Sequence, residues 1–235
     1  MKSILHLGLL LAIVHTVSAE VIRLKVGEDG NAAGILVADP VHPGPVILWL
    51  HGGMRSTRMD KGPDAVVTLQ PFLPAGRGLL CSPSAYRGSD WTQPAGLAHI
   101  EALLDSVAAR YPHARMDRLI IAGVSDGCLG ALHYAARGKR KPTRFLLFSV
   151  HPGLVLTPGQ LRDEPAFNST RWDIFQGGKD RLFPSAEVFP LLKDWARANP
   201  RVKLHLYPDG EHDFGWYAEN APEEIRTALK MEEKR

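Results

Sequence analysis

The sequence predicts a single α/β domain with a mainly parallel, twisted sheet flanked by helices. After an opening hairpin, short apolar runs alternate with segments of helical periodicity, which is the pattern of consecutive β-α-β units. The chain has 235 residues, of which 45% are hydrophobic, and this is enough for one full-sized core but not for two comfortable domains. Several expected strands end in residues capable of chemistry, and such residues meet at one edge of a parallel sheet.

The first 19 residues are expected to lie outside this domain. Lys2 precedes an apolar stretch, Ile4–Val14, and small residues follow up to Ala19, which is the pattern of a secretory signal peptide. The apolar stretch is too short to span a bilayer comfortably, and His6 and His15 interrupt it. We therefore predict cleavage near Ala19, a secreted or periplasmic domain over residues 20–235, and no stable membrane insertion.

Eight segments are expected to form strands. The first two are separated by a turn at Asp29-Gly30, which indicates a hairpin. The third is apolar throughout, which is typical of a strand buried on both faces. The expected strands are residues 20–26, 32–38, 46–53, 76–83, 117–124, 144–150, 171–177 and 201–208.

Helical periodicity is clearest where five aliphatic residues recur at helical spacing before Pro112 ends the segment. A later segment carries an internal proline, Pro190. The expected helices are residues 62–73, 96–112, 126–137, 186–200 and 221–234.

Composition argues against several classes of function. The formal net charge is +3, and the short basic cluster Arg137–Arg144 lacks the interleaved aromatics of a nucleic-acid surface, so we expect it to be a solvated loop. The two cysteines, Cys81 and Cys128, do not make a disulfide scaffold. Two buried free thiols are favoured over a single bridge. The sequence has no CxxC or HExxH motif, so no metal site is expected.

Ser125 lies in Gly123-Val124-Ser125-Asp126-Gly127, between an apolar strand and a helix. An abrupt strand-to-helix turn brings the residues two before and two after the serine close together, so only small side chains fit there. The serine is forced into strained backbone angles with its hydroxyl projecting. This pattern favours a nucleophile over an ordinary turn serine.

A serine hydroxyl needs a base, and the base needs an acceptor that fixes its tautomer. His212 is the candidate base, because it alone among the histidines lies between the last strand and the closing helix. Asp180 follows the penultimate strand in a glycine-containing loop, whereas Asp173 lies at the start of that strand and Asp213 is adjacent to His212. The predicted order is therefore Ser125, Asp180, His212.

These motifs together resemble the α/β-hydrolase family over essentially the whole chain after residue 19. The resemblance rests on "LWLHGG", "GVSDGC", "GGKDRLFP" and "GEHDFGW". It implies an α/β-hydrolase fold, a Ser-Asp-His triad and no cofactor. It also implies an oxyanion hole formed by the backbone N–H of Asp126 and by one from the His-Gly-Gly loop. Gly53 is preferred as the second donor because glycine allows close approach, and Met54 is the alternative.

Within the family the chain looks most like small dienelactone hydrolases, carboxylesterases and poly(3-hydroxybutyrate) depolymerases. It departs from them at Cys128, where those esterases often have glycine, and in having His-Gly-Gly without a third glycine. Many relatives insert a helical cap before the loop that carries the acid of the triad, which corresponds to "GGKDRLFP" here. Here that connection, residues 151–171, is too short for a cap domain, and an open site favours bulky or polymeric esters.

Four side chains are expected near the substrate because they follow strands at the same edge of the sheet. A polar surface loop is the alternative for the segment that holds the first two. The four are Tyr86, Trp91, His151 and Trp216.

The sequence thus predicts a serine esterase that hydrolyses small-molecule or polymeric carboxylic esters through an acyl-enzyme. A serine peptidase of the prolyl-oligopeptidase kind, a non-catalytic binding protein on the same fold and an acyltransferase remain alternatives. The sequence predicts no oligomeric state.

Overall fold

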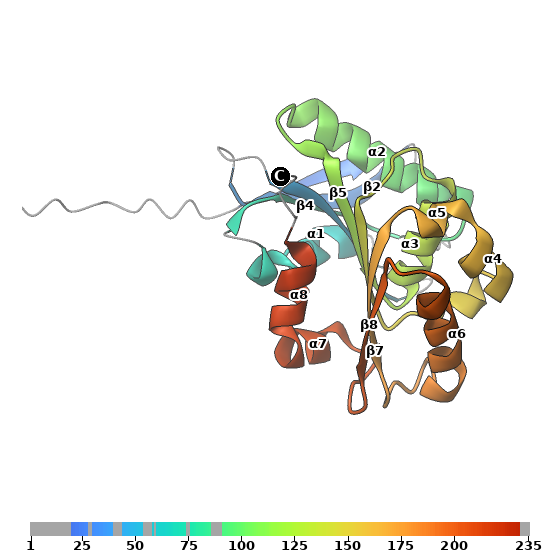
Figure 1. The fold of residues 1–235 in the computed structure, drawn as a ribbon. Helices are drawn as coiled ribbons and strands as arrows, with labels where there is room; N and C mark the ends of the chain where they lie inside the picture. Colours follow the sequence, from blue (N-terminus) through green and yellow to red (C-terminus); the bar gives the residue numbers. More distant parts are fainter. Residues whose placement is uncertain are drawn as a thin grey trace, which may run out of the picture.

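A mainly parallel sheet forms the centre of the fold (Figure 1). The computed structural model describes residues 20–27, 30–39, 44–53, 58, 60–73, 76–85 and 91–230. In spatial order the eight strands are β1 (Val21–Val26), β2 (Asn31–Val37), β4 (Leu79–Pro83), β3 (Pro45–Leu50), β5 (Arg115–Val124), β6 (Arg144–Phe148), β7 (Arg171–Gly177) and β8 (Val202–Tyr207). β2 pairs antiparallel with β1 and β4, and all other pairs are parallel.

Helices cover both faces of the sheet and give three layers (Figure 1). One face carries α2 (Pro94–Arg110), α3 (Asp126–Arg137), η3 (Pro152–Leu154), α4 (Pro158–Asp163), α5 (Pro165–Asn168) and α6 (Ser185–Ala198). The other carries α1 (Lys61–Ala65), η1 (Gln70–Phe72), α7 (Phe214–Asn220) and α8 (Pro222–Leu229). The predicted α/β class is therefore confirmed, and every residue of β3 is buried, as its apolar run predicted.

Two expected helices differ from the structure. The segment 62–73 forms only the short α1 and η1, joined by turns. Val66, Val67 and Thr68 are β-branched and poor helix formers, and Pro71 cannot donate a helical hydrogen bond. The closing helix ends at Leu229 within the described residues and is preceded by α7, which the sequence analysis did not predict.

The connection between β6 and β7 holds η3, α4 and α5, of three, six and four residues. Such short helices build no separate domain, so the expectation of a fold without a cap at this point is confirmed. Both cysteines are free and buried, as expected. Among the residues that the structure describes, no helix combines the length and apolar character needed to cross a membrane.

Several sequence predictions fall on residues outside the described ranges. They are the signal peptide over residues 1–19, the turn residue Asp29, the alternative oxyanion donor Met54 and the substrate candidate Tyr86. These stay predictions.

The apolar core on the α2–α3–α6 face is centred on aromatic stacking. The rings of Phe145 and Trp172 lie 4.2 Å apart and 10° from parallel, and both side chains are fully buried. The Trp172 ring in turn packs on Trp195 at 4.9 Å and on Phe167 at 5.7 Å. Neighbouring strands and helices are therefore held together by one aromatic cluster.

Replacing Phe145 with alanine is expected to lower the free energy of unfolding by about 3–5 kcal/mol, because a fully buried aromatic ring is removed and a cavity is left. Urea denaturation followed by tryptophan fluorescence measures the change. Val67→Ala, at a side chain that is 41% exposed, is the control and should change stability by less than about 1 kcal/mol. A Phe145→Ala variant as stable as this control would contradict the assignment of the cluster.

Candidate active site

Ser125 sits on a strained turn between β5 and α3. Its backbone angles are φ 55° and ψ −119°, a left-handed region that non-glycine residues rarely adopt. A Cβ atom on Gly127 would come within 1.9 Å of the Leu50 carbonyl oxygen, and one on Gly123 within 2.7 Å of the Gly127 backbone. Both glycines are therefore sterically required. At Gly123 the reason is the predicted closeness to Gly127, whereas at Gly127 it is the backbone of β3, which the sequence did not predict.

Three side chains predicted from the sequence meet beside this turn. His212 Nε2 lies 2.7 Å from Ser125 Oγ, and His212 Nδ1 lies 2.9 Å from both carboxylate oxygens of Asp180. Because the carboxylate can only accept from Nδ1–H, the neutral imidazole has its lone pair on Nε2, which can accept the hydroxyl proton of Ser125. This arrangement has the geometry of a nucleophile, a base and an orienting acid.

Asp180 is fully buried at its side chain and is held as a carboxylate. Burial raises its pKa, but the hydrogen bond from His212 and those from the amides of Phe183 and Leu182 outweigh burial, so the pKa lies below its ordinary value. Gln176 donates to the same carboxylate at 3.2 Å, while its carbonyl oxygen accepts from Val150 N at 2.9 Å. Gln176 thus links the loop that carries Asp180 to the chain just after β6.

The loop after β7, which carries Asp180 (the acid loop), and the loop after β8, which carries His212 (the histidine loop), pack closely against each other at glycine positions. The Lys179 amide donates to the Gly210 carbonyl at 2.9 Å. A Cβ on Gly177 would lie 2.2 Å from Gly210 O, and one on Gly178 would lie 2.5 Å from Pro208 O. Close backbone contact between the ends of β7 and β8 therefore sets the separation of Asp180 and His212.

A second serine, Ser149 at the end of β6, also has a positive φ of 55°. Its hydroxyl lies 3.0 Å from the Tyr217 hydroxyl and 3.4 Å from the carbonyl of Glu211, which precedes the base. Ser149 and Tyr217 were not predicted from the sequence, because nothing in the local sequence pairs residues that are 68 positions apart. Together they link the histidine loop to β6 and α7.

His51 fixes the loop that follows β3. Its Nε2 accepts from the Ala85 amide at 3.1 Å, so Nδ1 carries the proton and donates to Gly52 O at 2.9 Å. Burial lowers the pKa of His51 to about 4 against the effect of that hydrogen bond, and the positive charges of Lys61 and Arg58 add to the lowering. His51 is therefore neutral at pH 7.

Lys61, at the start of α1, also holds this loop. This role of Lys61 was not predicted from the sequence. Its ammonium donates to Gly52 O at 2.7 Å. The Gly52–Gly53 peptide is trans, so with its carbonyl directed at Lys61 the Gly53 N–H points the opposite way. Gly53 has φ +93°, and a Cβ there would lie 2.3 Å from Lys61 Nζ. Gly52 lies against Val124 O and Ser125 Cβ.

Asp126 follows the serine and begins α3, where helix amides are unpaired within the helix. Its side chain is buried and carries a charge that interacts with the Lys61 ammonium. The Lys61 pKa is lowered by partial burial and by Arg58, while Asp126 opposes that lowering. Lys61 thus offsets a carboxylate beside the backbone amides that the sequence analysis named as oxyanion donors.

The prediction that Trp91 contacts substrate is wrong. Its side chain is 0% exposed, and its indole N–H donates to the His51 carbonyl at 3.0 Å. A Cβ on Gly130 of α3 would lie 2.4 Å from Trp91 Cβ, so a glycine on the helix leaves the space that the tryptophan fills. Trp91 therefore holds the backbone of the loop at His51 through this hydrogen bond.

The other two described candidates lie near the site or behind it. His151 packs edge-on against Phe183 at 5.6 Å, and Phe183 packs edge-on against the His212 ring at 4.9 Å. Trp216, a partly buried residue of α7, packs against Tyr207 and Tyr217, both at 5.4 Å, at the margin of the core. Their contact with substrate stays a prediction.

Cys128, in the first turn of α3, packs behind the strained turn at Ser125. Its Sγ lies 3.0 Å from the Gly123 carbonyl oxygen and 3.2 Å from that of Phe148, so the single S–H proton is shared between two acceptors. Burial raises the pKa of the thiol well above its ordinary value. Cys128 is therefore a packing residue in its neutral form rather than a second nucleophile.

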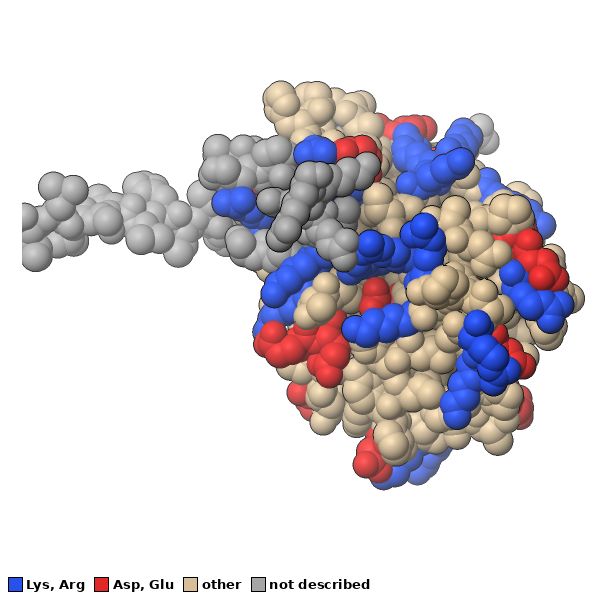
Figure 2. All heavy atoms as spheres, viewed as in Figure 1, with Lys and Arg blue, Asp and Glu red and all other residues tan. Residues whose placement is uncertain are grey.

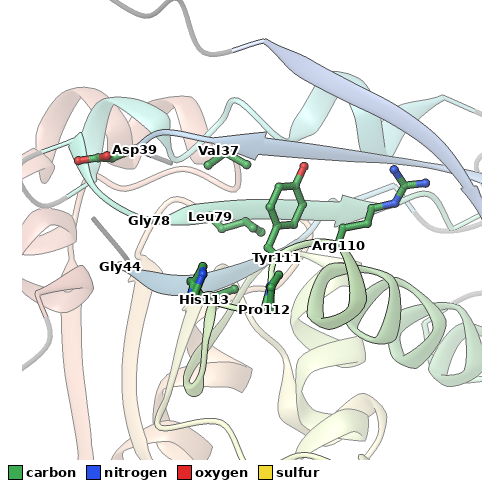
Figure 3. Close-up of a pocket in the computed structure, with 10 residues that line it drawn as sticks. Val37, Asp39, Gly44, Gly78, Leu79, Arg110, Tyr111, Pro112 and His113 are labelled. Carbon is green, nitrogen blue, oxygen red and sulfur yellow. The ribbon is translucent and has the colours of Figure 1, made fainter. Parts of the chain in front are cut away.

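A separate small cavity, of about 180 Å³, lies at the opposite edge of the sheet (Figure 3). Val37, Leu79 and Tyr111 line it, with Tyr111 and Arg110 coming from the end of α2. It brings together none of the predicted site residues. Over the described ranges, no three His, Cys, Asp or Glu side chains are grouped as a metal site requires.

Comparison with known proteins shows the fold. No protein-family model matches the chain, and no curated protein matches its sequence. Among solved structures, the esterase Pf2001 of Pyrococcus furiosus is 18% identical with a TM-score of 0.60, over 89% of this chain and 87% of that one. The α/β hydrolase MGS-M1 from a deep-sea metagenome is 19% identical with a TM-score of 0.60, over 83% and 84%.

The Pyrococcus horikoshii acylaminoacyl peptidase is 11% identical with a TM-score of 0.59, over 90% of this chain but only 40% of the peptidase. These similarities, together with the mainly parallel eight-stranded sheet, show that the chain has an α/β-hydrolase fold.

The buried neutral His51 predicts a loss of stability in mild acid. Below pH 6.5 the unfolded chain takes up a proton at His51 that the folded protein does not take up until about pH 4. The folded pKa is depressed, so stability present above pH 6.5 is lost as the pH falls through this window. Between pH 7 and pH 5 His51 should account for a loss of about 2 kcal/mol.

Urea denaturation of the wild type and of His51→Gln at both pH values measures this loss, because the other titrating groups are common to both proteins. His113→Gln, at an exposed histidine, should keep the wild-type dependence on pH. If His51→Gln lost as much stability as the wild type, the assignment of a neutral buried His51 would fail.

Proposed function

We propose that this protein is a serine hydrolase that cleaves carboxylic esters with Ser125 as nucleophile, His212 as general base and Asp180 as orienting acid. The observation that carries the proposal is the 2.7 Å contact between Ser125 Oγ and His212 Nε2 on a serine with φ 55°. The similarity in fold to esterases supports the choice of ester substrates.

In the proposed reaction, Ser125 Oγ attacks the ester carbonyl carbon as His212 Nε2 takes the hydroxyl proton. Asp180 stays ionised and stabilises the imidazolium through its contacts with Nδ1. The tetrahedral intermediate collapses when His212 gives its proton to the leaving alcohol, which leaves an acyl group on Ser125. A water molecule then attacks the acyl-enzyme, with His212 again taking and returning a proton.

The developing oxyanion is proposed to accept hydrogen bonds from the amides of Asp126 and Gly53. The helix start at Asp126 supplies an amide that has no partner within the helix. The anchored Gly52 carbonyl supports Gly53 as the second donor, because it turns the Gly53 N–H away from Lys61. Met54, the alternative donor, lies outside the described residues.

Bulky or polymeric esters are the proposed substrate class. Only the short helices η3, α4 and α5 occupy the connection between β6 and β7, where a cap domain would cover the catalytic residues. His151 is proposed to contact the acyl or alcohol group, because it packs on Phe183 and Phe183 packs on the His212 ring.

Ser125→Ala is expected to lower kcat for an activated ester such as p-nitrophenyl butyrate by about 10⁴-fold or more, because the nucleophile is lost. Circular dichroism and thermal unfolding should stay those of the wild type. Ser106→Ala on α2, which removes a hydroxyl bonded to the Ala102 carbonyl, is the matched control and should keep full activity. An N-acylaminoacyl p-nitroanilide assayed in parallel separates esterase from peptidase activity. Near-full ester turnover by Ser125→Ala would overturn the proposed mechanism.

Lys61 is proposed to position the Gly53 amide for the transition state. Lys61→Met should lower kcat by about ten- to a hundred-fold with little change in KM, because loss of one oriented oxyanion donor costs about a hundred-fold or more. Lys61→Arg should recover most of the activity, since a guanidinium can also donate to Gly52 O. Lys193→Met, on the exposed face of α6, is the control for loss of a lysine charge. Unchanged kcat in Lys61→Met, or loss of activity through KM alone, would exclude this role.

A further inference from the structure

A hollow with a strongly positive lining lies at the amino-terminal ends of β6, β7 and β8. It has a volume of about 580 Å³, and the end of α8 forms one wall. Figure 2 shows Lys and Arg side chains gathered on this face beside α8. We call this hollow the basic pocket, and its charged lining residues are Arg144, Arg171, Asp173, Arg201, Lys203 and Lys230.

The register of the strands brings these charges together. Arg144 on β6 pairs with Arg171 on β7, and Asp173 on β7 pairs with Lys203 on β8. Arg171 and Asp173 are two positions apart and so point to the same face of the sheet. That face also carries Phe175 in the core under α7 and α8. The charged side chains therefore occupy the amino-terminal half of a sheet face whose carboxyl-terminal half is apolar.

The single carboxylate among the charged lining residues is already compensated. Asp173 Oδ1 lies 3.2 Å from His205 Nε2, and its Oδ2 lies 3.8 Å from Arg144 Nε. The Arg144 guanidinium also donates to the Ala228 carbonyl. Among the ion pairs between described residues, none includes Arg201, Lys203 or Lys230. The described lining thus carries a clear excess of positive charge.

Protection of the sheet edge explains only part of this charge. Lysines on an edge strand discourage pairing with other chains, which accounts for Lys203 on β8. Arg144 and Arg171 lie on interior strands, where no edge needs protection. Arg144 is compensated by Asp173 and donates to the Ala228 carbonyl. The charges that a bound anion would neutralise are therefore those of Arg201, Lys203 and Lys230, which also line the basic pocket.

We propose that the basic pocket binds a small phosphorylated molecule with hydroxyl groups, of the chemical class of a sugar phosphate. Planar guanidinium groups match phosphate oxygens in pairs, and three of the five cations are arginines. The volume is that of a pocket for an organic molecule rather than for a bare phosphate ion. Asp173 accepts hydrogen bonds only, and this suits a hydroxyl group next to the phosphate.

This site is independent of the proposed triad. Ser125, Asp180 and His212 follow the carboxyl ends of β5, β7 and β8, whereas the basic pocket opens at the amino ends of β6 to β8. A ligand there does not reach the reacting atoms. Failure of the ester assay and failure of the binding assay are therefore separate results.

Isothermal titration calorimetry with glucose 6-phosphate tests the proposal on the whole protein. Saturable binding of one molecule per chain is expected, with no binding of glucose and weaker binding of inorganic phosphate. Arg201→Gln/Lys203→Gln should weaken binding of glucose 6-phosphate by about ten-fold or more, because two charges of the lining are lost. Lys193→Gln/Arg197→Gln, on exposed positions of α6, removes one lysine and one arginine elsewhere and should bind as the wild type does.

Three results would overturn the proposal. The first is no saturable binding of glucose 6-phosphate, and the second is equal weakening by both double variants, which would indicate an effect of net charge alone. The third is binding to vesicles that contain phosphatidic acid without binding of glucose 6-phosphate, which would assign the surface to a lipid headgroup instead. Ester hydrolysis by both double variants should equal that of the wild type.

Discussion

The geometry of the site depends on the crowding of three backbone segments at the end of β5. The strand has to reverse into α3 within one residue, and the Leu50 carbonyl of β3 lies where a side chain at position 127 would be. Only glycine fits there, and the remaining strain falls on Ser125 at φ 55°. The Ser125 amide donates to the Phe148 carbonyl at 2.9 Å, so β6 holds the turn from the other side. Ser125 keeps this strained conformation, half-buried, because the backbone segments around it exclude any other course of the chain.

Three buried polar side chains around this turn are paired through several hydrogen bonds each. Asp180, Gln176 and His51 are all buried, and each unpaired polar atom at such depth would cost free energy. Asp180 is satisfied by His212, two amides and Gln176, and His51 by the Ala85 amide and the Gly52 carbonyl. A network satisfied in this way has one low-energy arrangement. It holds the imidazole and the His-Gly-Gly loop in place before any substrate arrives.

The features that could be predicted from the sequence are those set by local residue patterns or by the order of strands and helices along the chain. Eight strands and the places of Ser125, Asp180 and His212 follow from apolar runs, glycines and the rule that parallel strands end at one edge. α7 was missed because seven residues with an internal glycine, Gly215, are too few to show helical periodicity. Trp91 was assigned to substrate by its place after a strand, but the space that buries it comes from Gly130, 39 positions further on. Lys61 could not be recognised for the same reason, since its target, Gly52 O, is identified only by how α1 folds back on β3.

The basic pocket and the candidate active site lie at opposite ends of the strands, so neither occupies the space of the other. On β7, Phe175 belongs to the core under α7 and α8, and two residues earlier Asp173 lies in the basic pocket. His205 joins the two halves, because its ring stacks on Phe175 at 4.4 Å and its Nε2 lies 3.2 Å from Asp173. α8 ends at Leu229, which belongs to the apolar half, and Ala228 and Lys230 line the basic pocket beside it. The basic pocket thus depends on charges at the amino ends of the strands, whereas Ser125, Asp180 and His212 lie on turns at their far ends. Each can change in sequence without moving the other, provided that the aromatic layer between them stays packed.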